Sequence, residues 1–498
     1  MKVRRRIDGN GRHFFDASIS RNTVELVMES PLRQPIRYKI TMCPVIPDSL
    51  ENLAMQAIED HVSQLCVQLM QNTVPEGKKL HHAQEKCKKL KHMLHYALPS
   101  IIANKITTKL LKCIDSLYDD IRTLIGESWC QDIIYELLNA IIHPGVTRLE
   151  LGAEPMHSFD YRYELNFIVV FLFDKLNTMN DLKVIRLANQ YCQGLLTKDI
   201  HVTENLEEFT SVSNCSDVLL EAVTESCKKL KRLHVSWSPD VTDTSVQSIL
   251  KLQHLQELSV MGKISQNGLT KLLNGLATNK GNADNETCSF QLLSFGCYNI
   301  STSHLNMLVE HFPNLVEIKL LCSSGCDFSS MEGLKCLQGL WLSNIRFSEI
   351  RQILIAVGSQ LLYLHLIYAE ALDVNFIGSH CPSLKCLHLI AYDESNPLPG
   401  DYTQPILPGF QSVECLHLNF PGTSWPKFFL LQCIYVRKLV IYLRNNINCQ
   451  QLELALQEAT LSHLEEMHWS PTCSYANNIA KLLLEKCPNL RVLRPLDR

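Results

Sequence analysis

The chain has 498 residues, 46% of them hydrophobic and 20% charged, and its 47 basic and 51 acidic side chains leave a net charge of −4. This balance excludes a protein that binds nucleic acid through an overall basic surface. The longest apolar run, Phe167–Phe173, is far shorter than the roughly 20 residues that a membrane-spanning helix needs. No apolar stretch follows the basic start Met1–Arg6, so we expect no secretory signal, no membrane contact and a cytoplasmic or nuclear location.

Neither the cysteines nor any known catalytic motif predicts a metal site or an enzymatic active site. The 20 cysteines are expected to be reduced thiols, because disulfides are rare in a reducing compartment. No pair has the Cys-x-x-Cys spacing of a zinc knuckle, so we predict no metal site and no cofactor. The sequence also lacks a Gly-x-Ser-x-Gly elbow, a phosphate-binding Gly-Lys-Ser/Thr loop and a His-Glu-x-x-His pair. We therefore do not expect an enzyme.

The first 47 residues are mixed in character and indicate no role. Within them Arg37–Cys43 alternates weakly between polar and apolar side chains, as a strand does. Residues 48–143 are expected to be helical.

The helical region opens with a short motif, Ser49-Leu50-x-x-x-Ala54-x-x-x-Ile58. Leu50, Ala54 and Ile58 stand four residues apart and therefore share one helix face. A leucine beside a small side chain suits a partner whose pocket must approach the helix backbone closely. The ordinary alternative is an amphipathic helix that packs internally.

A second motif follows downstream, where Leu98-Pro99 is succeeded by Ile102 and Ile106. Pro99 suits the first turn of a helix, because that position has no intrahelical partner for an N–H group. The stretch therefore predicts a helix that begins close to residue 99.

From residue 144 to the end, one pattern recurs: apolar, two variable residues, apolar, one variable residue, apolar. From Leu230 onward, all but one of the intervals match the roughly 20–29-residue period of leucine-rich repeats, in which each unit supplies one strand and one helix. The fold class predicted is therefore α/β, a leucine-rich-repeat solenoid, or horseshoe, over residues 144–498. The units begin at Val146, Leu182, Leu230, Leu255, Phe290, Leu315, Leu337, Leu361, Leu384, Val413, Val436, Leu464 and Leu490.

Two of the units carry insertions. Asn274–Cys288 is rich in glycine and asparagine, which predicts a loop. Pro397–Gly409 contains several prolines and predicts a stiffer, irregular segment.

The residue between the last two apolar positions of each unit is expected on the concave face, because neighbours in a strand point to opposite sides. These residues are Glu150, Arg186, His234, Ser259, Ser294, Lys319, Trp341, His365, His388, His417, Val440 and His468. Stacked strands would place four of them in one ladder, with Tyr363 beside it. We predict that this ladder binds a protein substrate; alternatively, duplication of related repeats copied histidine without a binding role. The ladder residues are Trp341, His365, His388 and His417.

The two helical motifs resemble those of ubiquitin-ligase substrate receptors. Ser49, Leu50, Ala54 and Ile58 match the BC box that binds Elongin C, and Leu98, Pro99, Ile102 and Ile106 match a cullin-2 box. The helix-ending phrases His-Cys-Pro-Ser-Leu at 380–384 and Lys-Cys-Pro-Asn-Leu at 486–490 resemble repeats of such receptors. The whole order is similar to the PRAME family and related cullin-2 receptors. The resemblance implies binding to Elongin C, Elongin B and cullin-2, with a protein substrate on the repeats.

Two other assignments stay open. Leu98-Pro99 followed by Ile101 and Ile102 also resembles an F-box opening, which implies Skp and cullin-1 as partners. Ile101 departs from the acidic residue usual in an F-box and from the second proline of a cullin-5 box. A leucine-rich-repeat scaffold outside any ligase is the third possibility.

Overall fold

The computed structural model describes four N-terminal strands and most of the chain from residue 76 onward. The strands are β1 (Lys2–Ile7), β2 (His13–Phe15), β3 (Thr23–Ser30) and β4 (Arg33–Thr41). They form one sheet in the order β2-β1-β3-β4. The later described ranges are 76–98, 100–122, 127–151, 167–188, 200, 203–212, 215–281, 291–322, 325–391, 407–419, 425–442, 446–469 and 476–495. The strand expected at Arg37–Cys43 overlaps β4, which pairs with β3 in antiparallel fashion.

The described residues of the region 48–143, which was predicted to be helical, are mainly helical. It comprises α2 (Glu76–His92), the π-helical turn η1 (Met93–Ala97), α3 (Ser100–Arg122) and α4 (Glu127–Ile141). Helix α4 packs on both α2 and α3, and α3 also contacts the first strand of the repeats, β5. Buried Leu110, Leu111 and Leu138 join the same hydrophobic core as the repeats, so this region closes one end of that core.

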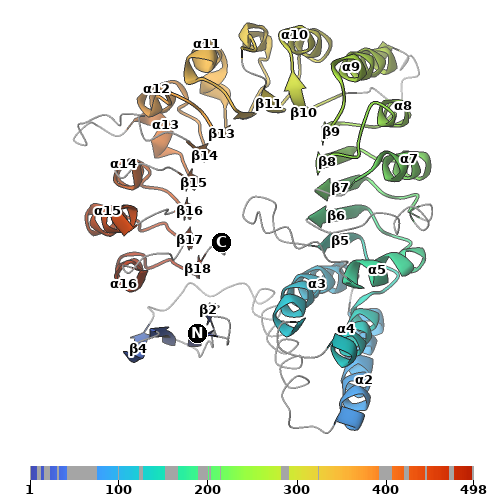
Figure 1. The fold of residues 1–498 in the computed structure, drawn as a ribbon, viewed down its shortest axis with the longest axis vertical. Coiled ribbons are helices and arrows are strands. Elements are labelled where there is room, and N and C mark those ends of the chain that lie inside the picture. Colours follow the sequence, from blue (N-terminus) through green and yellow to red (C-terminus); the bar gives the residue numbers. More distant parts are fainter. Residues whose placement is uncertain are drawn as a thin grey trace.

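The repeats form a single parallel sheet of 14 strands, arranged in strict chain order from β5 to β18. Figure 1 shows these strands along the inside of an arc and the helices along its outside. The fold predicted from the periodic pattern, an open leucine-rich-repeat solenoid of α/β class, is confirmed. The strands are β5 (Arg148–Leu151), β6 (Val184–Ala188), β7 (Glu208–Val212), β8 (Arg232–Ser238), β9 (Glu257–Gly262), β10 (Ser294–Ile300), β11 (Glu317–Cys322), β12 (Gly339–Ser343), β13 (Tyr363–Ile367), β14 (Cys386–Ile390), β15 (Cys415–Asn419), β16 (Lys438–Tyr442), β17 (Glu466–Trp469) and β18 (Val492–Pro495).

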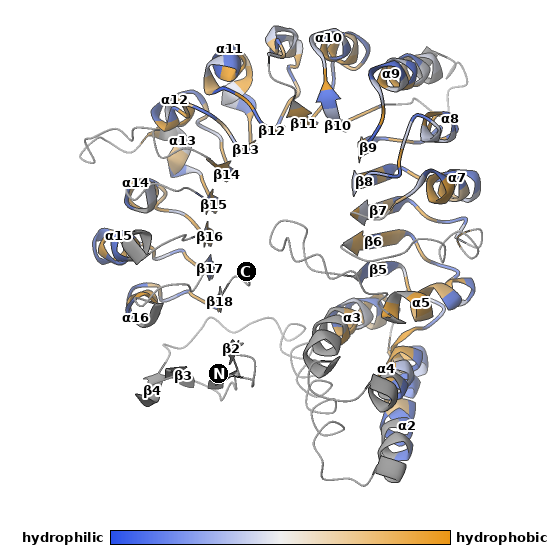
Figure 2. Cartoon of the chain, in the orientation of Figure 1, coloured by the Kyte–Doolittle hydropathy of each residue, from blue (hydrophilic) through white to orange (hydrophobic). Residues whose placement is uncertain are grey.

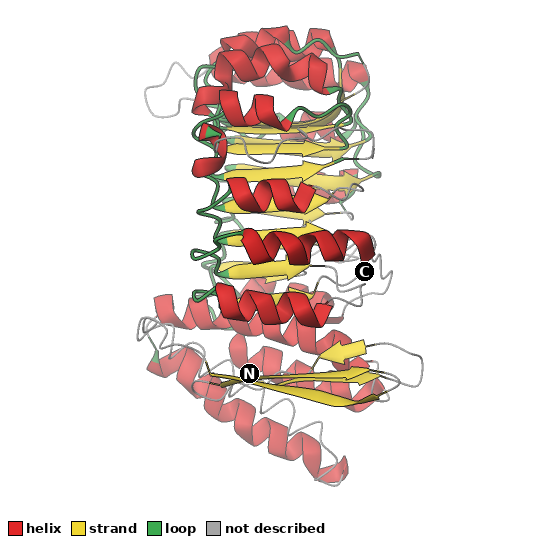
Figure 3. Ribbon diagram, turned by 90° about the vertical axis from the view of Figure 1, so that its left-hand side faces the viewer, coloured by secondary structure: helices red, strands yellow, loops and turns green. Residues whose placement is uncertain are grey.

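Between most consecutive strands, the described residues include a helical segment that returns the chain, and Figure 3 shows these segments stacked across the strands. The α-helices are α5 (Phe167–Asp174), α7 (Asp217–Ser226), α8 (Ser245–Ile249), α9 (Gln266–Gly281), α10 (Thr302–His311), α11 (Phe347–Val357), α12 (Val374–His380), α13 (Pro408–Gln411), α14 (Trp425–Gln432), α15 (Asn446–Glu458) and α16 (Ala476–Lys486). The 3₁₀ turns are η2 (Leu176–Thr178), η4 (Ser329–Gly333) and η5 (Gly358–Gln360).

The core lies between the strands and the helices, and Figure 2 shows apolar residues on both. Corresponding leucines of successive strands, such as Leu364, Leu387 and Leu416, are completely buried. Burial of each such side chain stabilises the fold by roughly 1.5–3 kcal/mol. The apolar residues of each strand face this core. The residues between them must therefore point to the opposite, concave side of the sheet.

Two details of the predicted repeats are wrong. Strand β7 was missed because its third core position is Ser211, which is buried beside Phe209 although it is polar. Strand β10 is shifted by two residues, since Phe295 pairs with Ile318 and Gly296 with Lys319. Gly296 therefore takes the ladder position of β10, whereas Ser294 lies two residues earlier in the neighbouring row of the same concave face. Strand β7 adds Thr210 to the ladder row.

The predicted loop Asn274–Cys288 is helical at its beginning, because α9 continues to Gly281. A Cβ atom at Gly275 would lie 2.4 Å from Cδ1 of Leu250, so glycine here permits close contact with the end of the preceding helix. Gly275 therefore serves the tight packing of neighbouring repeats and does not form a turn. Residues 282–290, and most of Pro397–Gly409, lie outside the described residues.

The close approach of adjacent repeats can be tested at Gly358, between α11 and α12. A Cβ atom there would lie 2.6 Å from the carbonyl oxygen of His380, and a backbone atom cannot move aside cheaply. We expect Gly358→Ala to lower the free energy of unfolding by about 1–3 kcal/mol, as overpacking does. Urea unfolding followed by circular dichroism measures the loss.

Gly333→Ala is the matched control. Its new Cβ atom would meet only Cγ1 of Val309 at 3.6 Å, an ordinary contact. The control should stay within about 0.5 kcal/mol of the unsubstituted protein. Equal losses in the two variants would contradict this account of repeat packing.

Candidate binding surface on the concave face

One row of side chains runs along the concave face because neighbouring strands pair residue for residue. Trp341 of β12 is opposite His365 of β13, which is opposite His388 of β14, which is opposite His417 of β15. Neighbouring strands lie about 4.8 Å apart, which is close to the spacing at which flat rings contact. The structure therefore brings together the four residues predicted to form a ladder.

The rings of this ladder touch in sequence. The centroids of Trp341 and His365 are 5.4 Å apart, those of His365 and His388 5.3 Å, and those of His388 and His417 5.1 Å. The last two pairs are tilted by 67° and 53°, so the imidazoles meet edge to face or nearly so. Val440 follows on β16 and is fully buried, which ends the row of rings.

Exposure differs along the ladder. His388 and His417 are only 5% and 7% exposed, so their rings are mostly covered by neighbouring side chains. Trp341 and His365 are half-buried, and Tyr363, beside His365 on β13, is 49% exposed. The surface that a partner can touch is therefore formed chiefly by Trp341, Tyr363 and His365, with the two covered histidines beneath and beside it.

His365 is held in its neutral form. Burial, followed by the nearby His417 and Lys319, lowers the pKa of its imidazole to about 4, against the opposing charge of Glu317. Its Nδ1 is buried without a hydrogen-bond partner, and its Nε2 lies 3.9 Å from the sulfur of Cys386. At neutral pH His365 is thus an uncharged ring, and its unpaired Nδ1 lies beneath the surface.

A second row lies two residues before the ladder on each strand. It contains Tyr363, Cys386, Cys415, Lys438 and Glu466 on strands β13 to β17. The pKa of the Cys415 thiol is lowered because the Cys386 thiol, His417 and Lys438 favour its thiolate, whereas the pKa of Cys386 is raised. The offset that identified Tyr363 in the sequence also leads to both cysteines, although only the tyrosine was singled out.

The N-terminal half of the concave face is charged. The carboxylate of Glu208, on β7, is nearly inaccessible and contacts both Arg186 and Arg232, the latter at 2.7 Å. Burial opposes ionisation of Glu208, but the two guanidinium groups outweigh it and keep its pKa below the usual value. Arg186 also lies 3.5 Å from Glu150. Sequence reasoning missed this network because it missed β7.

An aromatic pair stands at the far end of strands β8 and β10. Trp237 is 53% exposed, and its ring meets that of Tyr298 edge to face at 5.6 Å. Its φ of 53° lies in the left-handed region, where bulky residues are uncommon. The repeat pattern places neither residue at a core position, and it gives no signal of this pair.

The residues predicted to contact a cullin lie at the junction of the helical region and the repeats. Leu98 is half-buried against the core, and Pro99 lies outside the described residues. Ile102 is 39% exposed, whereas Ile106 is 3% exposed and packs inside the core. The apolar surface at this point is completed by Tyr96 and Ile101, which are 76% and 72% exposed.

Helix α3 is fixed firmly to the first repeat. The side-chain amide of Asn104 donates to the carbonyl of Gly145 at 2.6 Å and accepts from the backbone N–H of Thr147 at 2.9 Å. The exposed residues at the start of α3 are therefore held in a set orientation relative to β5. The residues predicted to bind Elongin C, Ser49, Leu50, Ala54 and Ile58, lie outside the described residues.

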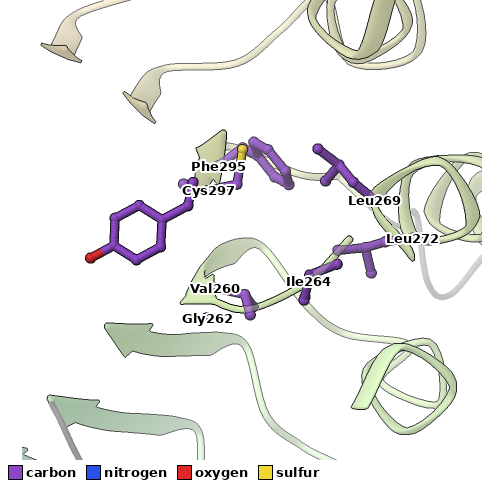
Figure 4. A pocket seen from close by; sticks show the side chains of 9 residues that line it. Val260, Gly262, Ile264, Leu269, Leu272, Phe295 and Cys297 are labelled. Carbon is purple, nitrogen blue, oxygen red and sulfur yellow. The ribbon is translucent and has the colours of Figure 1, made fainter. Parts of the chain in front are cut away.

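The described part of the chain contains a small cavity between two repeats. This cavity of about 10 Å³, lined by Val260, Leu272, Phe295 and Cys297, lies between β9, β10 and α9 (Figure 4). It has room for about one water molecule. Within the same residues no three histidine, cysteine or acidic side chains are placed to hold a metal ion, and no helix is long and apolar enough to cross a membrane.

No family model and no curated protein sequence matches the chain. Among solved structures, it is similar to a chain of the yeast Rad7 and Elc1 complex, with 14% identity, a TM-score of 0.40 and coverage of 89% of this chain and 92% of that one. It is also similar to an internalin, InlF, from Listeria monocytogenes, with 14% identity, a TM-score of 0.30 and coverage of 79% and 97%. Because both TM-scores lie below 0.5, no function or partner is transferred from either protein.

The neutral state of His365 makes the fold sensitive to acid. The unfolded chain binds a proton at this residue near pH 6.5, whereas the folded protein does so only near pH 4. The stability is therefore intact at neutral pH and falls as the pH drops from about 6.5 towards 4, by up to about 3 kcal/mol for this group. Urea midpoints measured across this range should show the fall.

His365→Asn, which cannot titrate there, should flatten this part of the profile. His463→Asn is the control, because His463 is exposed and lies outside the ladder. An unchanged pH profile in His365→Asn would show that another group causes the acid sensitivity.

Proposed function

We propose that this chain is the substrate-recognition subunit of a cullin-RING ubiquitin ligase and is not itself an enzyme. Residues 48–143 would bind Elongin C and cullin-2, and the concave face of the repeats would bind a protein substrate. Catalysis by the assembled ligase would then depend on proximity, because a bound substrate lysine is held at high effective concentration beside the ubiquitin thioester.

The observation that carries the proposal is the apolar surface at the start of α3. Tyr96, Ile101 and Ile102 are exposed although they are apolar or aromatic, and they lie within or beside the cullin-box-like stretch 98–106. Apolar and aromatic side chains with this exposure suit burial by a protein partner. The BC-box-like motif at 49–58 supports the same assignment from the sequence alone.

The concave face is suited to binding a peptide or a protein. Trp341 and Tyr363 offer large, partly exposed rings, and aromatic residues are enriched at the energetic centres of protein interfaces. On strands β6 to β8, Glu208 already pairs with Arg186 and Arg232. These charges would therefore help to orient a ligand more than they would add to its affinity. We infer that a substrate segment contacts the ring ladder of the C-terminal half.

The adaptor assignment is tested by affinity purification of the tagged full-length chain from cells. Elongin B, Elongin C and cullin-2 should co-purify. Leu50→Ser should abolish all three, because a hydroxyl cannot fill an apolar pocket. Ile101→Asp combined with Ile102→Asp should lose cullin-2 and keep Elongin C.

Ile355→Ser serves as the control for a lost apolar surface residue. Ile355 is 54% exposed on α11, away from the helical region, and this variant should keep every partner. Recovery of Skp and cullin-1, unaffected by Leu50→Ser, would assign the chain to the F-box class instead. Recovery of neither adaptor would leave a repeat scaffold outside any ligase.

The substrate surface is tested by rescue of cells that lack this protein. Proteins whose half-lives lengthen in its absence should regain rapid turnover with the unsubstituted chain. They should not regain it with Trp341→Ala combined with Tyr363→Ala, because loss of interface anchors costs about 2 kcal/mol or more each. Elongin C binding should be unchanged in this variant.

Tyr435→Ala is the matched control, since Tyr435 has the same 49% exposure as Tyr363 but precedes β16 outside the ladder. It should restore turnover fully. Full rescue by the Trp341→Ala and Tyr363→Ala double variant would exclude the ladder as the substrate surface.

A further inference from the structure

Two cysteines face each other on the concave side of the repeats. Cys386 of β14 and Cys415 of β15 are directly paired in the parallel ladder of strands, and both are half-buried. Their Cα atoms are separated by the spacing of neighbouring strands, about 4.8 Å. This spacing lies within the range of Cα separations that a disulfide can bridge, about 4.4–6.8 Å.

The two thiols of this pair are half-buried, whereas the other cysteines whose side chains are described, apart from the exposed Cys336, are buried. Cys227, Cys381 and Cys433 are completely buried under the helices, and burial raises the pKa of each thiol. Thiols in such apolar surroundings are unreactive. Cys336 is exposed, but it has no second cysteine on a neighbouring strand among the described residues.

The neighbours of the pair favour one thiolate. His365 Nε2 lies 3.9 Å from the sulfur of Cys386, and the thiol of Cys386 donates in turn to Cys415. His417 and Lys438 also stabilise negative charge on Cys415, which lowers its pKa. A half-buried thiolate beside a cation and a second thiol has the environment of a reactive cysteine, with its resolving partner already in place.

We propose that Cys415 and Cys386 form a reversible redox site on the concave face, which closes to an intrachain disulfide by exchange with a low-molecular-weight disulfide such as oxidised glutathione. This site does not depend on the proposed ligase function. It is a property of the thiol pair and would operate equally in a scaffold protein.

The exchange proceeds in two steps. The Cys415 thiolate attacks one sulfur of the external disulfide, so its S–S bond breaks, a mixed disulfide forms and one thiolate leaves. Cys386 then loses its proton to that thiolate and attacks the sulfur of Cys415, which releases the second external thiolate. In total the protein loses two electrons to the external disulfide, which is reduced to one thiol and one thiolate, and this thiolate takes up from water the proton that Cys415 released on ionising.

The strand geometry makes such a bridge labile. Cβ atoms of directly paired residues in neighbouring strands point the same way and stay about as far apart as the strands, beyond the usual disulfide Cβ separation of about 3.8 Å. A bridge formed across them is strained, and strained disulfides are reduced readily. Closure would remove the thiolate charge between Tyr363 and Lys438 and so alter the binding surface.

The test uses the purified full-length protein incubated with glutathione at graded ratios of oxidised to reduced form. Free thiols are then alkylated and the protein is analysed by intact mass and peptide mapping. We expect a peptide in which Cys386 is linked to Cys415, with a loss of two hydrogens, and its disappearance when reduced glutathione is restored. Circular dichroism should confirm that the repeats remain folded.

Single substitutions separate the two roles. Cys386→Ser should accumulate a stable mixed disulfide of glutathione at Cys415, because the resolving thiol is gone. Cys415→Ser should greatly slow modification at Cys386, and Cys336→Ser should leave the linked peptide unchanged. Absence of the linked peptide in the folded protein at every glutathione ratio would overturn the proposal, as would a bridge that reduced glutathione cannot open.

Discussion

Residue-for-residue pairing of the parallel strands is the constraint on which this molecule depends. A shift by one residue would turn the leucines of a strand towards solvent and its polar residues into the core, so each register is strongly determined. Leu364, Leu387 and Leu416 are completely buried in this arrangement. Because their positions are fixed, the residues between them must stack on the concave face.

The same constraint explains how much the sequence could predict. Alternating apolar residues were sufficient for the solenoid and for the ring ladder, since both follow from a period of two. Strand β7 was not predicted because the polar residue Ser211 occupies one of its core positions. The register of β10 was predicted two residues too early because Phe290, Leu293 and Phe295 also fit the pattern. Only contact with adjacent repeats decides between such alternatives.

The sequence could not predict how exposed each side chain of the ring ladder is. His388 and His417 occupy the same repeat position as Trp341, yet they are nearly covered whereas Trp341 is half-buried. A repeat pattern gives the position of a residue in its strand but not the atoms that cover its side chain. By contrast, the pairing of Cys386 with Cys415 follows from the same register as the ladder, two residues earlier on consecutive strands.

The two halves of the concave face differ in what they can offer a ligand. In the N-terminal half, Glu208 already holds Arg186 and Arg232, and removing either guanidinium from a buried carboxylate is costly. In the C-terminal half, the rings of Trp341 and Tyr363 retain exposed area. A ligand therefore gains most by covering these rings, while α3, anchored through Asn104, keeps any partner at its start in a constant position relative to the first repeat. The start of α3, next to β5, and the rings on β12 and β13, in the middle of the sheet, are thus connected through one continuous hydrophobic core.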